Sequence, residues 1–217
     1  DSIDVWVVFG RPIIDRYLEW LGSALSGVLG YSRTFRQPVF DILGPRLLNT
    51  VLLLGSSSIL AIMIAIPLGI FAALSAHRPL DEAINLFCFA GVSVPSFWLS
   101  LVLILVFAVS LGWLPAGGMG PIDGGGIFAK LSYMVLPVTA LTVASLASYT
   151  RFMRASMIDA LRQDFARTAR AKGAGRARVV LGHALRNAMV PVVTIIALDF
   201  GALFSGALVT ETMFAYL

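Results

Sequence analysis

Charged residues are scarce in this sequence, and that scarcity excludes most soluble folds. Only 13% of its 217 residues are Asp, Glu, Lys or Arg, whereas 58% are hydrophobic. A soluble domain normally carries about a quarter charged residues. Long apolar segments that are separated by short polar loops therefore predict an all-α protein, a polytopic transmembrane helical bundle.

Residues that carry catalytic or metal chemistry are also few. Cys88 is the single cysteine, so no internal disulfide can form, and His77 and His183 are isolated from other ligand-type residues. The phosphate-binding pattern GxxxxGK[ST] does not occur. We therefore expect no catalytic residue, no metal and no cofactor in this chain, and no nucleic acid as a partner. This chain therefore has no P-loop of its own.

The basic residues are concentrated in one stretch, 151–187. It holds nine of the sixteen lysines and arginines, opposed only by Asp159 and Asp164. Because successive spans alternate sides, this stretch shares a side with the loop 76–83, and together the two loops hold ten basic residues. The positive-inside rule places that side in the cytoplasm.

Apolar residues recur in this stretch at the three- and four-residue spacing of a helix. They are Ile158, Leu161, Phe165 and Ala169. The helix is expected to end near Gly173, because glycine suits a C-terminal cap. A second helix is expected from about Arg176, with Ala177, Leu181, Leu185, Ala184 and Ala188 on one side.

Charge and period alone leave two interpretations of this predicted helix pair. It is either a solvated basic loop that fixes topology and touches anionic membrane lipid, or a docking element for a cytoplasmic partner. A hinge at glycine, an apolar stripe and nearby charges would suit insertion into a partner's groove.

The segment RTARAKGAGRARVVLGHALRNAMVP, which begins at Arg167, resembles the cytoplasmic EAA loop of ABC-importer permeases. It is most similar to the dipeptide, oligopeptide and nickel group, whose loops read close to RQDYVRTARAKG followed by HALRNALIP. Residues 167–169 stand where the general pattern has Glu-Ala-Ala, Gly173 where it has glycine, and residues 185–186 where it has Leu-Pro. The glutamate and the proline of the general pattern are absent, and the peptide-group variant has the same replacements.

The resemblance implies a fold and an architecture. The fold would be the MetI-like permease fold of type I ABC importers, in a B-type inner-membrane subunit. Four spans would lie in this chain, which would be a fragment of a six-helix subunit with one more helix before Asp1 and one after Leu217. Residues 1–45 would be an extracytoplasmic segment, and 46–217 the transmembrane domain with its coupling loop at 154–187.

The resemblance also implies partners and a docking surface. The partners would be a second homologous permease subunit, two cytoplasmic ABC ATPase subunits that hold ATP and Mg²⁺, and an extracytoplasmic substrate-binding protein. The cargo would be a dipeptide or oligopeptide, or a related small molecule such as a nickel chelate or glutathione. The residues implied in ATPase coupling are Asp164, Phe165, Arg167, Thr168, Ala169, Arg170, Ala171, Lys172 and Gly173.

The four spans are expected at about 47–75, 84–111, 135–153 and 190–214. Small residues at every fourth position let helix backbones approach closely in lipid. They form three stripes: Ala61, Ala65, Gly69 and Ala73; Ala140, Ala144 and Ser148; Ala197, Gly201 and Ser205. Pro67 should kink the first span.

The segments outside the spans carry weaker patterns. Tyr17, Leu18, Trp20 and Leu21 indicate a short amphipathic helix, and without the resemblance the first 45 residues would equally suit an interfacial segment lying on the bilayer. The glycine- and proline-rich stretch 112–134 is expected to be a loop, with room for a small helix near Phe128.

Candidates for the translocation pathway lie in the second and fourth spans. Ser93, Pro95 and Ser96 interrupt the second span, and a proline flanked by hydroxyls either lines a pathway or only bends a helix. Asp199 lies inside the fourth span, where a carboxylate is costly and marks a functional site. A position near the interface, or a pair within the assembly, would explain Asp199 equally well.

Two other classes of function compete with the permease. A secondary transporter driven by an ion gradient would need several ionisable groups in the membrane, and Asp199 is the only clear one. An intramembrane enzyme would need a nucleophile with a base, and Ser93 and Ser96 have no histidine within a span to serve them.

Overall fold

A computed structural model of the chain describes residues 12–120 and 126–216, most of which lie in α-helices. The chain divides into two compact units, residues 1–49 and 50–217, and each is described by itself. The long helix α3 (Val39–Leu74) begins in the first unit and continues into the second.

The first unit holds the expected amphipathic helix and a small hairpin. Helix α2 (Ile13–Leu25) buries none of its residues, and most of its apolar side chains lie exposed. Strands β1 (Tyr31–Ser32) and β2 (Gln37–Pro38) pair antiparallel, with Tyr31 opposite Pro38. The guanidinium of Arg46 lies 5.3 Å from the centre of the Phe35 ring, a cation–π contact within this unit.

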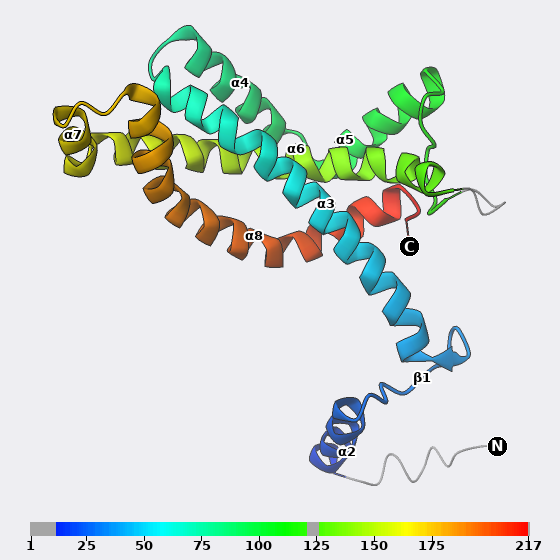
Figure 1. The fold of residues 1–217 in the computed structure, drawn as a ribbon. Coiled ribbons are helices and arrows are strands. Elements are labelled where there is room, and N and C mark those ends of the chain that lie inside the picture. Colours follow the sequence, from blue (N-terminus) through cyan, green and yellow to red (C-terminus); the bar gives the residue numbers. More distant parts are fainter. Residues whose placement is uncertain (1–11, 121–125, 217) are drawn as a thin grey trace. The chain divides into compact units, whose positions relative to one another are not determined.

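The second unit is a bundle of long helices (Figure 1). After α3 its elements are α4 (Pro79–Ser93), α5 (Ser96–Leu103), the π-helix η1 (Ile104–Ser110), α6 (Ile127–Arg162), α7 (Asp164–Ala171), the π-helix η2 (Arg178–Ala184) and α8 (Leu185–Met213). Among the described residues three helices are long and apolar enough to cross a membrane. The pair formed by α4 and α5–η1 makes a fourth if it is one broken span.

The helices extend beyond the limits expected from hydropathy. Helix α3 begins at Val39 and runs through Pro67 without a break, so the kink at Pro67 stays a prediction. Helix α6 begins at Ile127, which makes the small helix expected near Phe128 the first turn of this span. Hydropathy marks the part of a helix that suits lipid, whereas backbone hydrogen bonds continue a helix past that part.

The second expected span is not a single helix. Its two parts, 79–93 and 96–110, meet at an angle of 97°. Val94, between them, has φ −92° and ψ 120°, an extended conformation. A residue that precedes proline is driven out of the α region by the proline ring, so Pro95 ends α4 and turns the chain.

The first stripe of small residues is confirmed as a packing face. Ala61, Ala65, Gly69 and Ala73 are all buried. A Cβ atom added at Gly69 would lie 2.5 Å from Cβ of Met153 and 2.9 Å from the carbonyl oxygen of Thr150. Only glycine therefore allows α3 to approach α6 this closely, as the packing of small residues in membranes requires.

The other two stripes do not behave as one face within this chain. Ala140 is buried, but Ala144 is exposed because α6 buries the neighbouring face that carries Leu146, Tyr149 and Met153. In the third stripe Ala197 and Gly201 are exposed, and the side chain of Ser205 lies outside those that the structure describes.

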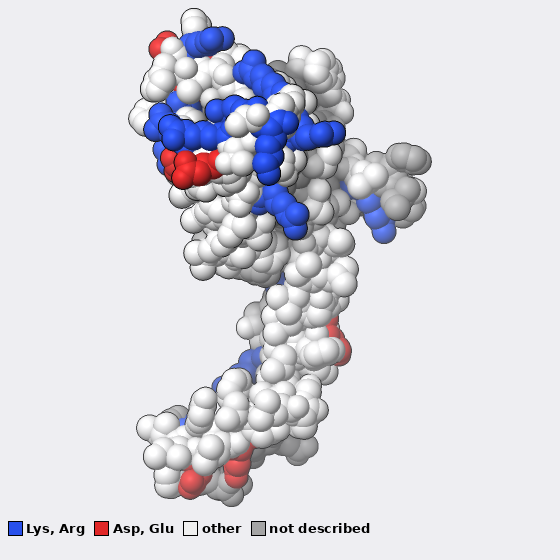
Figure 2. Space-filling model, turned by 60° about the vertical axis from the view of Figure 1, so that its left-hand side comes forward, with Lys and Arg blue, Asp and Glu red and all other residues white. Residues whose placement is uncertain are grey.

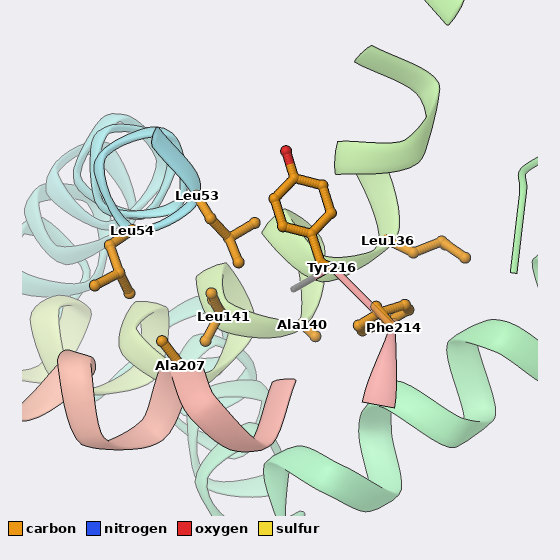
Figure 3. Close-up of a cluster of buried hydrophobic side chains, with 8 residues drawn as sticks. All are labelled: Leu53, Leu54, Leu136, Ala140, Leu141, Ala207, Phe214 and Tyr216. Carbon is orange, nitrogen blue, oxygen red and sulfur yellow. The ribbon is translucent and has the colours of Figure 1, made fainter. Parts of the chain in front are cut away.

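The main hydrophobic cluster joins α3, α6 and the end of α8 (Figure 3). Its buried members are Leu53, Leu54, Leu136, Ala140, Leu141, Ala207, Phe214 and Tyr216. The backbone N–H of Gly118 donates to the carbonyl of Phe214 over 2.8 Å, and this bond ties the segment after η1 to the end of α8. The cluster thus fixes the end of the bundle opposite to α7.

We expect Gly69→Ala to destabilise the bundle and Gly55→Ala, its matched control, to leave it intact. Alanine at position 69 would overpack the α3–α6 contact, which typically costs about 1–3 kcal/mol. Nothing lies within 4 Å of a Cβ at Gly55, so there alanine brings only the gain of about 0.5–1 kcal/mol that it gives in a helix. Thermal unfolding of both variants in detergent measures the difference; equal midpoints would contradict the close approach.

Candidate functional site

Basic side chains gather at the end of the second unit that carries α7 and η2. Figure 2 shows this end crowded with lysine and arginine, which outnumber the few acidic side chains beside them. The exposed basic residues of α7 and of the segment that follows it are Arg167, Arg170, Lys172, Arg176 and Arg178. A surface of this kind attracts anionic groups or an acidic partner surface.

The predicted order of helix, glycine turn and helix is confirmed at its centre. Helix α7 ends at Ala171, and Gly173 follows with φ +80°. The N–H of Gly173 donates to the carbonyl of Arg170 over 2.9 Å, and the N–H of Ala174 donates to that of Ala169 over 3.0 Å. These two bonds are the Schellman motif, whose left-handed residue is usually glycine.

The first predicted helix is wrong in its continuity. Residues 158–169 are not one helix, because α6 ends at Arg162 and Gln163 is extended with ψ 159°. Helix α7 begins again at Asp164, with this acid in its first turn and Arg170 in its last. Both charges complement the helix dipole, which stabilises a short separate helix at this point.

The two sides of α7 have different surroundings. Ala166 and Ala169 are buried against Val179, with Phe165 packed alongside, so this side holds the hairpin together. The other predicted coupling residues are exposed: Asp164, Arg167, Thr168, Arg170, Ala171, Lys172 and Gly173. Of the nine predicted residues, seven are therefore open to a partner, while Phe165 and Ala169 serve the packing of the chain itself.

A hollow of about 600 Å³ lies beside α7. Five of the predicted coupling residues line it: Phe165, Thr168, Ala169, Lys172 and Gly173. Arg178 and His183 close its other wall from η2. The structure thus brings together, in one concave surface, residues that sequence reasoning had grouped only by motif.

The second predicted helix is confirmed in its start at Arg176 and in the second half of its predicted side, and wrong in the first half. Ala184 and Ala188 are buried as one side with Leu185 packed alongside, whereas Ala177 and Leu181 are exposed and Val179 and Val180 are buried instead. The cause is the π-helix at 178–184, since its wider turn shifts the side chains away from the positions that a 3.6-residue period predicts.

A buried ion pair near this end was missed by sequence reasoning. Arg154 donates from Nε to Oδ1 of Asp81 over 2.5 Å and from Nη2 to Oδ2 over 2.6 Å. The N–H of His77 and the side-chain amide of Asn85 also donate to this carboxylate. The side chain of Asp81 is 3% exposed, and the pair ties the first turn of α4 to α6.

The four pathway candidates fall on two separate parts of the bundle. Ser93 and Ser96 flank the bend at Pro95, and the Ser93 hydroxyl donates to the carbonyl of Phe89 over 2.8 Å. Asp199 is half-buried in α8, close enough to the Tyr149 hydroxyl of α6 for an electrostatic interaction, although no hydrogen bond of normal length joins them. Within the described residues no hydrogen bond or ion pair links Asp199 to either serine.

These features describe an all-α membrane component built around a basic helical hairpin. Residues 65–217 match the family described as binding-protein-dependent transport system inner membrane component, and this match covers well over half of the chain. The chain belongs to that family of inner-membrane transport proteins, as the resemblance of its loop predicts.

Curated relatives support the peptide-group assignment. The chain is 40% identical over 207 residues to the oligopeptide transport system permease protein AppB of Bacillus subtilis, which is 94% of this chain and 66% of AppB. It is 38% identical to a putative peptide permease of Brucella suis, covering 99% of this chain and 68% of that protein. Its identity to the glutathione transport system permease GsiC of Escherichia coli K12 is 38%, over 94% of this chain and 64% of GsiC. The chain thus spans about two thirds of the length of these relatives.

We expect Asp81→Asn to destabilise the protein strongly and Asp164→Asn to lower its stability by no more than the roughly 0.3–1 kcal/mol that an exposed charge gains from the helix dipole. Removal of one partner from a buried ion pair costs about 3–5 kcal/mol, and because Arg154 is 23% exposed we expect the lower end of that range. Asp164 pairs with Arg167 at 3.7 Å on the open surface, where such pairs contribute little.

Thermal unfolding of Asp81→Asn and Asp164→Asn in detergent measures the difference. The single variant Arg154→Gln and the double variant with Asp81→Asn complete a double-mutant cycle for the ion pair. If Asp81→Asn and Arg154→Gln each had the same unfolding midpoint as the unaltered protein, the ion pair would have no structural role.

Proposed function

We propose that this chain is a permease subunit of an ATP-driven importer and forms part of its transmembrane pathway. The observation that carries the proposal is the α7–η2 hairpin, a short exposed helix held at a fixed angle by the Gly173 cap, in a chain of this transport family. The comparisons give no support to a secondary transporter driven by an ion gradient.

The proposed orientation follows the basic residues. The loop 76–83 and the coupling loop at 154–187 lie in the cytoplasm, and the segment 1–45 and the 112–134 loop lie outside. Of that outer loop, residues 121–125 are outside the described part of the structure. The ten-to-six division of basic residues supports this orientation.

The proposed assembly has four kinds of partner. A second homologous permease completes the pathway, two cytoplasmic ATPases bind ATP and Mg²⁺, an extracytoplasmic protein delivers the cargo, and the membrane lipid surrounds the bundle. The names of the relatives, which refer to oligopeptide, peptide and glutathione transport, support peptides or similar small molecules as cargo. The chain itself performs no chemistry on the cargo in this proposal.

Coupling in this proposal uses the open side of α7. Arg167, Thr168 and Ala171 are exposed and are not members of the Val179 cluster that holds the hairpin. An ATPase groove would receive this side, and the hollow beside Thr168 and Lys172 would receive a protruding side chain of the ATPase. Closure of the two ATPases would then move the hairpin as one body.

We expect Thr168→Trp to release the ATPases from an otherwise stable permease. The bulky ring would obstruct the open side of α7, because position 168 is exposed and lines the hollow. Substrate-stimulated ATP hydrolysis by the reconstituted complex should fall at least about tenfold, which corresponds to about 1.4 kcal/mol. Ala169→Trp is the contrasting variant: it should lower the stability of the permease itself, because Ala169 is buried on Val179.

Glycines 173 and 175 supply a matched pair for the angle of the hairpin. Gly173 has φ +80°, so alanine there is strained by roughly 1–2 kcal/mol, whereas the φ angle of Gly175 is not positive. We expect Gly173→Ala, and not Gly175→Ala, to weaken the coupling of ATP hydrolysis to substrate. If ATP hydrolysis stayed fully coupled to substrate in both Thr168→Trp and Gly173→Ala, α7 would not dock on an ATPase, and the hairpin would be only a solvated basic loop.

The proposed pathway is lined by Ser93, Pro95 and Ser96 at the bend and by Asp199 on α8. We expect Asp199→Asn to change the KM or the rate of peptide uptake by at least about threefold while the complex still assembles, since a charge at membrane depth is retained for function. Asp159→Asn, an exposed acid of the loop, is the control. Uptake into proteoliposomes measures both, and unchanged kinetics in Asp199→Asn would make that carboxylate incidental to transport.

A further inference from the structure

An apolar groove runs between the end of α3 and η2, on a different side of the hairpin from the hollow beside α7. Its volume is about 600 Å³. Pro67, Phe71 and Leu74 form the α3 wall, and Ala177 and Leu181 form the η2 wall. Phe71 is 57% exposed and Leu181 59% exposed, so nothing in the described chain covers this groove.

A single charged side chain, Arg176, stands at this groove. Arg176 also lines an adjoining cavity of about 420 Å³, which Arg170 lines as well, and the groove and this cavity share Leu74 and Val180, so they are continuous. Arg176 is the only charged residue that lines both. Arg176 is exposed, and in the described part of the chain no acidic side chain forms an ion pair with it. The site therefore offers an apolar trough with an unneutralised positive charge at its end.

We propose that this groove binds an anionic phospholipid of the cytoplasmic leaflet, with an acyl chain along α3 and the phosphate at Arg176. The inference rests on the proposed orientation, which places the end of α3 and the whole of η2 at the cytoplasmic face. Basic pockets between transmembrane helices on that face bind anionic headgroups. The guanidinium can make charge-assisted, bidentate hydrogen bonds to a phosphate.

The dimensions of the groove favour a lipid over a protein helix. From Pro67 to Leu74 the α3 wall extends only about 10 Å, at ~1.5 Å per residue. A transmembrane helix needs about 30 Å of contact to cross the hydrocarbon. The first part of an acyl chain below its headgroup, in contrast, fits a short trough with a charge at one end.

The position of the groove gives the lipid a role in coupling. One wall belongs to the membrane-spanning helix α3, and the other belongs to η2, which follows the Gly173 turn and packs through Val179 on α7. A lipid in the groove would support η2 against α3. It would thus hold the coupling hairpin at a fixed angle, and anionic lipid would stimulate the coupled ATPase.

Native mass spectrometry of the purified complex tests the site. The complex is delipidated and incubated with equal amounts of phosphatidylglycerol and phosphatidylcholine. We expect the unaltered complex to retain phosphatidylglycerol in preference to phosphatidylcholine. In Arg176→Gln, the occupancy by phosphatidylglycerol should be about tenfold lower than in the unaltered complex. Ala177→Trp should fill the groove and lose both lipids. Arg162→Gln, an exposed basic residue outside both cavities, is the matched control and should retain the preference.

Three results would overturn the lipid site: equal retention of the two lipids, unchanged phosphatidylglycerol occupancy in Arg176→Gln, or an equal loss in Arg162→Gln. Lipid retention is measured without ATP hydrolysis, so this experiment tests the lipid site independently of the proposed transport function. A complex that hydrolyses ATP in response to substrate but retains no phosphatidylglycerol would keep the proposed function and lose this site. In nanodiscs, phosphatidylglycerol should raise the substrate-stimulated ATPase rate of the unaltered complex and not that of Arg176→Gln.

Discussion

The bidentate pair between Arg154 and Asp81 is the contact on which the arrangement of the hairpin end depends. It joins residues 73 positions apart in sequence and removes the Asp81 carboxylate almost completely from solvent. A buried carboxylate is tolerated only when its charge is neutralised and its oxygens accept hydrogen bonds. Arg154, His77 and Asn85 meet both requirements, so the start of α4 is held at one point of α6, and the loop before α4 is bound to it through His77.

Sequence reasoning was most reliable where one local feature decides the structure. Gly173 could be predicted as a cap because only glycine adopts φ near +80° at low cost, and Gly69 could be predicted as a contact because a stripe of small residues repeats around it. Pro95 is the local cause of the bend between α4 and α5, but the 97° angle of that bend has no local cause. A proline excludes the α conformation before it, whereas the direction of the next helix is set by packing on α6 and α8.

Features that depend on distant partners could not be read from local patterns. In the π-helix η2, Val179 and Val180 are buried and Leu181 is exposed, and Ala177 just before it is exposed too, which differs from the side predicted for a regular α-helix. A 3.6-residue period in the sequence cannot predict a π-helix. Ala169 illustrates the same limit within the candidate site. The motif groups it with the exposed residues of α7, but its methyl group is buried against Val179. A motif identifies residues that act together, while burial decides which of them face a partner.

Helix α6 brings these contacts together over less than two turns. Tyr149 lies beside Asp199 of α8, Met153 touches Gly69 of α3, and Arg154 binds Asp81 in the first turn of α4. These three positions span only about 7.5 Å along the axis, at ~1.5 Å per residue. The same helix continues to Arg162, and only Gln163 separates it from α7. Val180 and Ala184 of η2 pack with Met157 and Ala160 of α6. Because packed contacts resist gradual deformation, a displacement that carries the hairpin and α6 together would either break the Asp81 pair or move α3, α4 and α8 as well. The strength of that pair therefore favours a bundle that responds as a unit.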